Sequence, residues 1–538
     1  MTAHNLAGYE SVTQAGISVA MKAHLVGGGL ASMAAAAYLI REAGVPGSDI
    51  FIYERGDGPG GSLRIFGDPT FGYVYPGGRV FEREYRCAFD LFSFIPARTD
   101  PEHSIKDEIL DFNAHFGWDN RARLIDGDGK ILPQGPMGVR FSDRLNLLRV
   151  LLTPERKLQG KRIQDCVSPA FFISEFWYIW SSIMAFRPRH GAIEMRRYML
   201  RFMHLLPELW SMTFILRTKV NQHQAIVEPL ANWLADRGVS FLVNSFVSDI
   251  LLDDAPSSIA ATALRIDQEG HEREVPVGDG DLVFATHGSP VFGMTMGSMD
   301  APPPAHGGDP WALWRRLAKK RTQFGNPSAI ADHIEDSLWV SFTVTDRGSP
   351  FARLIEAFTG REAGRGGLVT FRDSNWFITI TRFHHPNVVD QPADVFLWWG
   401  YGIYPERPGN FIKKPMVECS GAEILQEVLY HLKFQMDADD IVKSSVCIPC
   451  LMPYAASLFL WRMLTDRPKV VPEGSTNLAF IGQYCEQPGD VPFTMEYSVR
   501  SARTAVHTLT NKGRPPPPIY RGYLDPRVLF HTAWAFQK

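Results

Sequence analysis

Two short apolar runs near the start of the chain, residues 23–26 and 50–53, enclose a glycine turn and an alanine-rich stretch. The first run leads into three glycines, residues 27–29, and the second ends in Glu54. Short apolar runs bounded by glycine favour buried strands, whereas the longer alanine-rich stretch favours a helix. The pattern therefore predicts a strand, a tight turn, a helix and a second strand over residues 22–54.

Further buried strands are predicted much later in the chain, each ending in a glycine turn. Residues 281–286 form an apolar run that enters a His-Gly-Ser turn at 287–289, and residues 477–481 form another that ends at Gly482. Open parallel sheets bind their ligands at the carboxyl ends of the strands. We therefore expect these two turns and the first glycine turn to converge on one site.

The middle of the chain has a different pattern. Residues 105–210 are mostly helical in pattern, and their most apolar part, residues 171–186, contains Glu175. That part is shorter than the roughly 20 residues that a membrane span needs, so we expect a buried helix lining a lipophilic cavity. Strand-like alternation returns at 240–252, and aromatic and β-branched runs within 325–460 predict a second sheet that walls the substrate site.

Together these patterns predict an α/β fold, in which a discontinuous Rossmann-like dinucleotide-binding domain is joined to a mixed α+β substrate domain and a helical cap. The dinucleotide-binding domain is expected to use three separate stretches of chain. The expected ranges are 22–135, 215–300 and 470–512 for the dinucleotide-binding domain, 136–214 for a helical substrate-lining segment, 301–469 for the substrate domain and 513–538 for a C-terminal extension.

Composition and charge fit a large folded enzyme. The 538 residues are 45% hydrophobic and 21% charged, which is enough apolar material for a substantial core. The formal net charge of −3 provides no overall basic field for nucleic acid or an anionic membrane. Local basic clusters, Arg315-Arg316 and Lys319 to Arg321, fit a solvated helix face, or else a patch that attracts a fatty carboxylate or membrane phospholipid.

Cysteine usage and the start of the chain bear on the compartment. Six cysteines at irregular spacing form no disulfide framework, which favours a reducing compartment. Cys447 and Cys450 have a redox-like spacing but sit among apolar residues, so buried packing is the favoured interpretation. Residues 1–20 show no basic start followed by an apolar block, so we expect a cytoplasmic protein.

The first glycine turn has the chemistry of a dinucleotide site. Gly27 allows the tight reversal after the strand, Gly29 lets backbone N–H groups approach a pyrophosphate, and the following helix N-terminus attracts that anion. Glu54 is placed to accept hydrogen bonds from a ribose, and Ser32 takes the third small position of the motif. An ordinary strand-to-helix turn is the alternative. A second glycine-rich loop, residues 59–62, can approach the other half of the cofactor.

A set of short motifs extends over nearly all of residues 23–510. The motifs are Pro59 to Leu63, Gly77 to Arg79, Asp90 to Phe92, Ile95-Pro96, Phe176-Trp177, Ala185-Phe186, Arg197-Tyr198, Arg201-Phe202, Asn221-Gln222, Gly474 to Gln483 and Glu496 to Arg500. In this order they resemble the oleate hydratases, also called myosin-cross-reactive antigens. Members of that family are flavoproteins that add water to the cis double bond of unsaturated fatty acids.

The resemblance implies an FAD-dependent hydratase that converts a cis-9 unsaturated fatty acid such as oleate into the 10-hydroxy acid without net redox change. It implies an unsaturated fatty acid as partner, a monomer or homodimer, and room for peripheral contact with membrane lipid. The residues expected to hold FAD are Gly27, Gly29, Leu30, Ala31, Glu54, Arg55, Gly61, Ser62, Gly78, Arg79, Val247, Thr286, Ser289, Gly482 and Gln483.

Two catalytic roles follow from the same resemblance. Tyr198 matches the proposed proton donor of the family, and the cations on its segment are expected to stabilise its phenolate. From pattern alone, a core tyrosine with a satisfied hydroxyl is the alternative. Gln222 matches a residue that positions the fatty chain or its head group; a polar residue in a turn is the alternative.

The chain departs from the family where the family motif is Arg-Gly-Gly-Arg-Glu-Met, whose Glu is thought to activate water. Here residues 76–81 read Pro-Gly-Gly-Arg-Val-Phe, and Val80 cannot accept a proton. Glu82 lies two residues further on, and alternate residues of an extended segment share a face, so Glu82 is one candidate base. A surface-exposed Glu82 is the alternative. In that case the remaining candidates for activating water are the substrate carboxylate, backbone carbonyls or a hydrogen-bonded water.

Other classes of function remain open at the level of sequence. A flavin oxidoreductase of the amine oxidase or desaturase type shares the nucleotide fold, and a non-catalytic lipid or flavin carrier would tolerate Val80. The adjacent His384 and His385 have no third ligand at a useful spacing, so no metal is expected.

Overall fold

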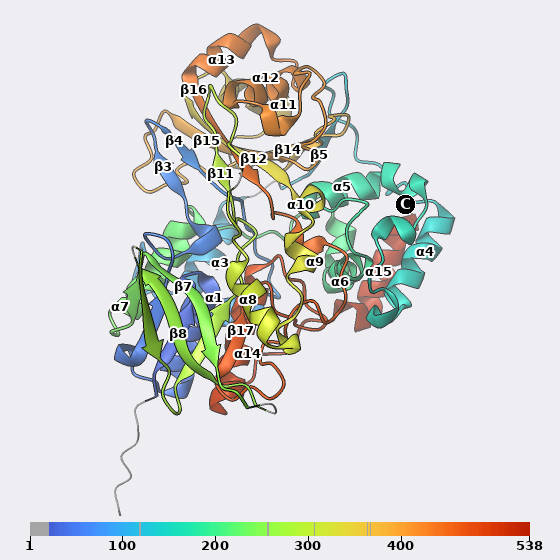
Figure 1. Ribbon diagram of the computed structural model, residues 1–538. Coiled ribbons are helices and arrows are strands. Elements are labelled where there is room, and N and C mark those ends of the chain that lie inside the picture. The colour runs from blue at the N-terminus through green and yellow to red at the C-terminus, as the bar shows by residue number, and fades with distance from the viewer. Residues whose placement is uncertain are drawn as a thin grey trace, which may run out of the picture.

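Two sheets organise the protein, one at the bottom and one at the top of Figure 1. The computed structural model describes residues 21–537 except 118, 119, 256, 257, 269, 306, 363 and 366; residues 1–20 lie outside the described residues. The lower sheet has five parallel strands in the order β17-β10-β1-β2-β6. These strands are β1 (Ala23–Val26), β2 (Ile50–Tyr53), β6 (Ser240–Leu242), β10 (Leu282–Thr286) and β17 (Leu478–Ile481).

Helix α1 (Leu30–Tyr38) is buried along its whole length, and a π-helical turn continues it to Ala43. Its alanines let it fit between the parallel sheet and α14 (Met495–Thr510), which contacts it closely. The strand, turn, helix and strand expected over 22–54 are thus confirmed. The parallel sheet combines strands from distant parts of the chain, which confirms the discontinuous Rossmann-like α/β fold.

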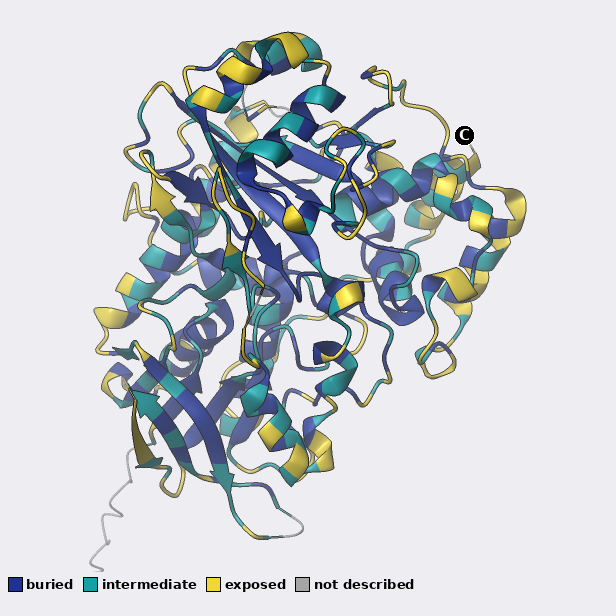
Figure 2. Ribbon diagram, turned by 45° about the horizontal axis from the view of Figure 1, so that its top comes forward, coloured by how far each residue is buried: buried dark blue, intermediate teal, exposed yellow. Residues whose placement is uncertain are grey.

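The upper sheet has seven strands in the order β11-β16-β12-β15-β14-β13-β5. Its central strands are dark blue in Figure 2 because they are buried on both faces. Helices α11 (Phe351–Thr359), α12 (Gly421–His431) and α13 (Ala438–Ser444) cover its outer face. The strands are β5 (Arg123–Ile125), β11 (Thr295–Met296), β12 (Trp339–Arg347), β13 (Val369–Phe371), β14 (Ile378–Arg382), β15 (Val395–Gly402) and β16 (Ser445–Met452).

The strand-like pattern over 240–252 belongs to two different sheets. Asn244 has a φ of +49°, and this bend separates β6 in the parallel sheet from β7 (Ser245–Leu252). Strand β7 forms a three-stranded antiparallel sheet with β8 (Ala261–Gln268) and β9 (His271–Pro276). The single alternating run at 240–252 therefore forms two strands, β6 and β7, which belong to different sheets.

A helical lobe forms the right side of Figure 1. It contains α4 (Phe141–Leu152), α5 (Glu175–Met184), α6 (Ala192–Arg201) and the C-terminal α15 (Pro526–Gln537). Helix α5 falls within the apolar segment 171–186, and among the described residues no helix is long and apolar enough to cross a membrane. The other helices are α2 (Arg86–Phe92), α3 (Ile105–His115), α7 (Glu228–Ala235), α8 (Ala312–Lys320), α9 (Ser328–Ala331) and α10 (Ile334–Ser337).

The first stretch of chain, residues 22–135, reaches both sheets. A hairpin of β3 (Phe66–Asp68) and β4 (Gly72–Val74) packs against β12 and β16, and β5 pairs with β13. The backbone N–H of Tyr75 donates to Thr343 Oγ1 of β12 over 2.9 Å. The hairpin therefore leads residues 76–80 into the space between the sheets, while the proposed division into domains stays a prediction.

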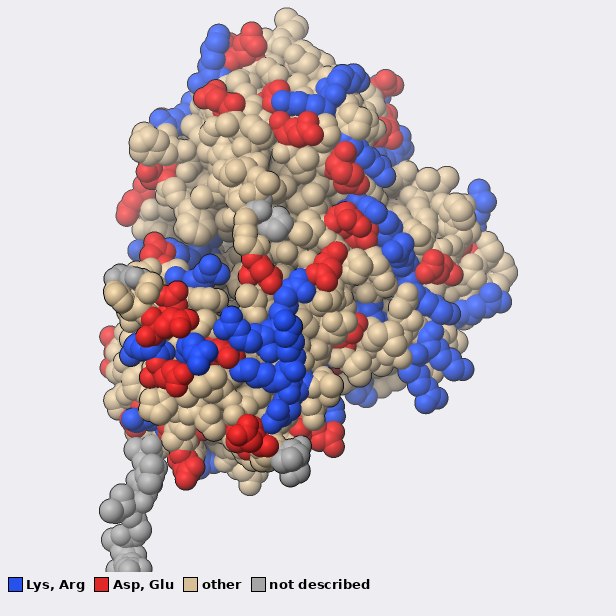
Figure 3. All heavy atoms as spheres, viewed as in Figure 1, with Lys and Arg blue, Asp and Glu red and all other residues tan. Residues whose placement is uncertain are grey.

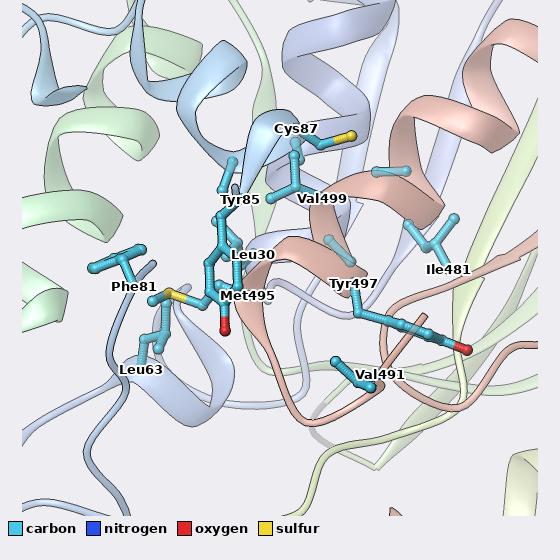
Figure 4. Packing of buried hydrophobic residues seen from close by; sticks show 14 of the residues in the cluster. Leu30, Leu63, Phe81, Tyr85, Cys87, Ile481, Val491, Met495, Tyr497 and Val499 are labelled. Atoms are coloured by element: carbon cyan, nitrogen blue, oxygen red, sulfur yellow. The ribbon is translucent and has the colours of Figure 1, made fainter. Parts of the chain in front are cut away.

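Residues 81–85 then pack back onto the dinucleotide-binding half of the molecule. Figure 4 shows Phe81 and Tyr85 beside Leu30, Leu63 and Met495, which come from α1, the second glycine loop and α14. All five side chains belong to one buried apolar cluster. This cluster fixes the chain immediately after residues 76–80, and so helps to hold that loop at the site.

Candidate functional site

A cavity of about 550 Å³ lies at the carboxyl ends of the parallel strands. The structure brings the three predicted glycine turns together there, although they are far apart in the sequence. Every residue expected to hold FAD lines this cavity except Gly78, which lines a second cavity described below. The lining residues from that set are Gly27, Gly29, Leu30, Ala31, Glu54, Arg55, Gly61, Ser62, Arg79, Val247, Thr286, Ser289, Gly482 and Gln483.

The first glycine turn leaves the N-terminus of α1 open to this cavity. Gly27 has a φ of +92°, and a Cβ there would lie 2.3 Å from Thr286 Oγ1. Gly28 N–H donates to Glu54 Oε2 over 2.6 Å, which ties the turn to the end of β2. A Cβ on Gly29, by contrast, would meet no atom within 4 Å. The turn thus offers open backbone and a helix N-terminus to an anion such as a pyrophosphate.

His287 lines the same cavity, and sequence reasoning did not assign it a role. Its ring stacks on Trp314, with centroids 4.6 Å apart and planes 8° apart. Both ring nitrogens are buried, and among the described residues neither has a hydrogen-bond partner. Burial lowers the pKa of His287 to about 3, so the ring is neutral and offers one donor and one acceptor. Its position directly after β10 was the only signal available in the sequence.

These observations fit a dinucleotide cofactor. Buried polar atoms without partners are rare in native proteins and indicate a missing ligand or water. A glycine cradle, an open helix N-terminus and an imidazole without a partner among the described residues face one cavity at the dinucleotide-binding position of the fold.

A second cavity, of about 220 Å³, lies between the two sheets. Its walls come from residues 76–80, the end of α5 and the strands of the upper sheet, and they are largely apolar. Leu63, Arg64 and Arg79 line both cavities. The two cavities therefore adjoin, and the Arg79 side chain stands at their junction.

One wall of the second cavity carries cationic side chains. Burial lowers the pKa of Arg217 to about 10, and Arg217 Nη1 donates to the carbonyl of Gly364 over 3.4 Å. The Cβ position of Gly364 lies 2.4 Å from the His384 Cα, so Arg217 and His384 reach the same short loop. Arg382 also lines the cavity, and burial lowers its pKa although Glu356 lies 3.5 Å away. These residues come from distant segments that the sequence did not connect.

Tyr198 lies directly behind the second cavity rather than in its lining. Its hydroxyl accepts a hydrogen bond from the Phe493 N–H over 3.0 Å, and Phe493 lines the cavity. Burial raises the pKa of Tyr198 well above 10, and the charge of Glu194 adds to that rise. The Arg79 guanidinium lies 4.8 Å from the centre of the Phe493 ring.

The cations beside Tyr198 on α6 are paired with acids, which corrects the expectation that they stabilise its phenolate. Arg197 lies 2.7 Å from Glu155 and 2.6 Å from Glu486. Arg201 is paired with Glu82, and neither cation is among the main influences on the tyrosine. These buried ion pairs anchor the helix that carries Tyr198 instead of neutralising a phenolate.

Glu82 is buried, with 4% of its surface exposed, so the alternative of a surface-exposed Glu82 is wrong. It lines neither cavity; its Oε1 lies 2.9 Å from Arg201 Nη1, and its Oε2 lies 3.7 Å from His204 Nε2. Burial raises the pKa of Glu82, but His204 and Arg201 together lower it below its ordinary value. The carboxylate is thus charged and directed at Arg201. Val80 lines the second cavity.

Gln222 lines the second cavity and contacts the loop that separates it from the first. Its Nε2 donates to the backbone carbonyl of Arg79. Asn221, its neighbour, donates to the backbone carbonyl of Asn387 over 3.1 Å, and both asparagines also line the cavity. Gln222 therefore holds the residue that stands at the junction of the cavities.

Several other sequence motifs have structural roles. His190 Nδ1 accepts a hydrogen bond from the Arg187 N–H over 2.9 Å, and the residue is fully buried. Cys447 and Cys450 are buried in β16, which confirms their packing role. In the basic cluster on α8, Arg315 pairs with Asp309 and Asp332, and Lys320 pairs with Asp249.

The model of the MCRA family matches residues 20–507. This chain belongs to the MCRA family. An oleate hydratase from Streptococcus pyogenes serotype M49 (strain NZ131) is 34% identical over 520 residues, 94% of this chain and 88% of that protein. A linoleate hydratase from Lactiplantibacillus plantarum is 32% identical over 534 residues, 91% of this chain and 93% of that protein. The resemblance found in the sequence is thus confirmed.

Solved structures show the same fold in more distant proteins. An oxidoreductase from Methanosarcina mazei has a TM-score of 0.50 at 12% identity, covering 91% of the MCRA protein and 100% of that chain. Cyclohexylamine oxidase from Brevibacterium oxydans IH-35A has a TM-score of 0.55 at 12% identity, covering 91% of the MCRA protein and 99% of that chain. At this identity the likeness concerns fold alone and leaves function to the site.

Proposed function

We propose that this MCRA family protein is an FAD-dependent fatty acid hydratase that adds water to the cis-9 double bond of an unsaturated fatty acid such as oleate. The observation that carries the proposal is the junction of two cavities at Arg79, one with dinucleotide-binding chemistry and one with apolar walls. The names of two relatives, an oleate hydratase and a linoleate hydratase, support the substrate class.

The second cavity suits a fatty acid because its chemistry changes along its length. Apolar walls bury the hydrocarbon chain, which is favourable at about 25 cal/mol per Å² of apolar surface. The cationic wall at Arg217 and Arg382 supplies charge-assisted hydrogen bonds for a carboxylate. Binding the carboxylate at that wall fixes which carbons of the chain lie beside Phe493 and Tyr198, and so fixes the register of the reaction.

Hydration of an alkene needs one proton donor and one water. Tyr198 does not line the second cavity, so the proposed reaction requires the substrate to displace the Phe493 wall far enough to reach the Tyr198 hydroxyl. That hydroxyl then gives its proton to one alkene carbon, and water oxygen forms a bond to the other. The oxonium proton of that water then passes, by way of the acceptor named below, back to the Tyr198 phenolate, so atoms and charge balance. Because attack on a carbon with developing positive charge needs only weak base assistance, Val80 is compatible with turnover. The substrate carboxylate, a backbone carbonyl or a second water takes the proton.

The proposed cofactor is FAD, held by the glycine cradle, the N-terminus of α1 and His287. Since hydration changes no oxidation state, bound FAD would supply shape and electrostatic stabilisation rather than electrons. Arg79 and Gln222 would connect the two cavities, because the Arg79 backbone is held by Gln222 while its side chain lines both. Six free cysteines fit the proposed reducing, cytoplasmic location.

Anaerobic incubation of the purified protein with oleate and FAD tests the function. The expected product is heavier than oleate by one water and carries its hydroxyl at carbon 10, as read by mass spectrometry. Hydrogen peroxide formed on admission of oxygen, or a product with a new double bond, would favour the flavin oxidoreductase alternative. Binding of oleate and FAD without any turnover of several unsaturated acids would favour a carrier.

A further inference from the structure

A third cavity, of about 210 Å³, lies between α5 and the loops that follow β13 and β15 of the upper sheet. Helix α5 contributes Trp177, Tyr178 and Ser181 to this cavity, whereas the next residues of the helix, 182–184, line the second cavity. Among the described residues, none that lines the third cavity also lines either of the other two. The third cavity is therefore separate from the site of the proposed reaction.

The charged side chains that line the third cavity are cationic. Arg372 and Arg407 line it, and among the described residues no Asp or Glu does. Arg372 is already paired, since its Nε lies 2.9 Å from Asp373 Oδ1. The Arg407 guanidinium has no ion pair within the described part of the chain and lies 4.0 Å from the centre of the Tyr404 ring. A planar guanidinium held on a ring keeps its N–H edge free for two parallel hydrogen bonds to a carboxylate.

The arginines on either side of a proline that lines this cavity already have acidic partners. Arg187 pairs with Glu406 over 2.7 Å, and Arg189 pairs with Asp336 over 2.9 Å. Figure 3 shows blue and red side chains next to each other where the upper part of the molecule meets the lobe at the right. Because these charges neutralise one another, Arg407 is the cation that an anionic ligand would meet unpaired.

Aromatic rings form much of the remaining wall. Tyr178 and Phe377 line the cavity with their ring centroids 6.1 Å apart and their planes 23° apart. Phe172 and Trp177 line it with their rings nearly perpendicular, at 84°. Phe377 has a φ of +49°, and bulky residues held in this conformation occur preferentially at ligand sites. Stacked and edge-on rings suit a ligand with a flat aromatic body.

Two buried hydroxyl groups give independent evidence of a ligand. Ser181 and Ser374 line the cavity, and only 2% and 7% of their surface is exposed. Among the described residues, neither Oγ has a hydrogen-bond partner. Buried polar atoms without partners are rare in native proteins and indicate a missing ligand or water. The two serines come from α5 and from the loop after β13, so both sides of the cavity show this feature.

We propose that the third cavity binds a small aromatic monocarboxylate, with its ring between the aromatic walls and its carboxylate bonded to Arg407. A neutral aromatic molecule would leave the guanidinium unpaired, and an acyl chain would make no use of the ring faces. The inference does not rest on the proposed function, because this cavity shares no lining residue with the other two and binding is measured without turnover.

Titration calorimetry of the full-length protein with 2-naphthoate tests the proposal. Naphthalene-2-carboxamide is the matched ligand, because it has nearly the same shape but no charge. It is expected to bind at least about tenfold more weakly, since it cannot form charge-assisted hydrogen bonds. Saturation with oleate is expected to leave the affinity for 2-naphthoate unchanged, because the two ligands occupy different cavities.

A pair of arginine variants locates the ligand. Arg407→Ala is expected to bind 2-naphthoate at least about tenfold more weakly than the wild type. Arg237→Ala is the matched control, because it also removes an exposed guanidinium held on a ring, 3.8 Å from the centre of Trp233, but lines none of the three cavities. It is expected to bind like the wild type. Both variants are expected to keep the wild-type melting temperature, since both side chains are exposed.

Several results would overturn the proposal. Absence of 2-naphthoate binding by the wild type would do so, as would equal binding of the carboxamide. Wild-type affinity in Arg407→Ala would place the ligand elsewhere in the protein. Displacement of 2-naphthoate by oleate would show that the third cavity belongs to the path of the fatty acid.

Discussion

The Tyr198 hydroxyl oxygen accepts a hydrogen bond from the backbone N–H of Phe493 over 3.0 Å. This contact uses one of the two lone pairs of the hydroxyl oxygen, and among the described residues no acceptor for the hydroxyl proton is found. Because Phe493 also lines the second cavity, the Tyr198 hydroxyl lies directly behind the wall of that cavity. A phenol with a raised pKa stays protonated at neutral pH, as a proton donor must.

Replacing Tyr198 with Phe removes this proton and leaves the ring. We expect kcat to fall by about 10²-fold or more, the usual contribution of a positioned general acid. The Phe493 N–H loses its acceptor, so unfolding should require about 1 to 3 kcal/mol less free energy. Product formation from oleate measures the first effect and denaturant unfolding the second. Tyr178→Phe is the control, since Tyr178 does not line the second cavity; wild-type turnover by Tyr198→Phe would remove the residue from the mechanism.

The dinucleotide half of the site was predictable because its chemistry lies in contiguous residues. Gly27, Gly29 and Glu54 occur in one strand, turn, helix and strand unit whose pattern is local. The later strands were recognisable because each is a short buried run ending in glycine, as at Gly482. Parallel strands bring such turns to one edge of the sheet, so convergence follows from topology rather than from any detail of packing.

The substrate half was not predictable from the sequence because its residues come from segments that are far apart in the chain. Arg217 and Arg382 have no local motif, and only the seven-stranded sheet brings the end of β14 beside the segment that carries Arg217. The partner of Glu82 is Arg201, on a helix more than a hundred residues later. Glu82, two residues after Val80, was a candidate base in the sequence, but its carboxylate points at the Arg201 guanidinium, a contact that the local sequence does not reveal.

Glu82→Gln separates a positioning role from a catalytic one. The change keeps the size of the side chain but removes the charge facing Arg201, and breaking a buried ion pair typically costs about 3 to 5 kcal/mol. We expect a marked loss of unfolding free energy and a modest fall in kcat with KM little changed, since Arg201 lies on the helix of Tyr198.

Glu84→Gln serves as the matched control for this variant. Its partner Arg86 is exposed, and such surface pairs contribute about 1 kcal/mol or less. If Glu82→Gln abolished turnover while its unfolding free energy stayed at the wild-type value, Glu82 would act on the substrate or water directly.

His287→Leu tests the cofactor cavity without measuring catalysis. Leu removes two buried polar atoms that lack partners in the protein, so the cofactor-free variant should be as stable as the wild type or more stable. If the imidazole bonds to FAD, affinity should fall about tenfold, which corresponds to about 1.4 kcal/mol. Titration calorimetry with FAD reads the affinity, and His507→Leu, outside both cavities, is the control. Unchanged FAD affinity in His287→Leu would exclude the contact.

His190 should make stability depend on pH. Its Nδ1 accepts from the Arg187 N–H and its Nε2 contacts the Asp336 carbonyl at 3.1 Å, so the folded protein holds the ring neutral. Burial lowers its pKa to about 3, whereas the unfolded chain takes up this proton near pH 6.5. Between these values the unfolded state binds more protons, so the contribution of His190 is complete above pH 6.5 and declines as pH falls.

The loss is about 1.4 kcal/mol for each pH unit below 6.5. His190→Asn removes this titration, so the free energy of unfolding should fall less steeply with acid in the variant than in the wild type. Urea unfolding at pH 7.5, 6 and 5 measures both slopes, and the difference between them isolates His190 from other histidines. Above pH 7 the two slopes should agree, whatever the cost of the substitution itself. Parallel slopes down to pH 5 would show that the folded protein takes up this proton as readily as the unfolded chain.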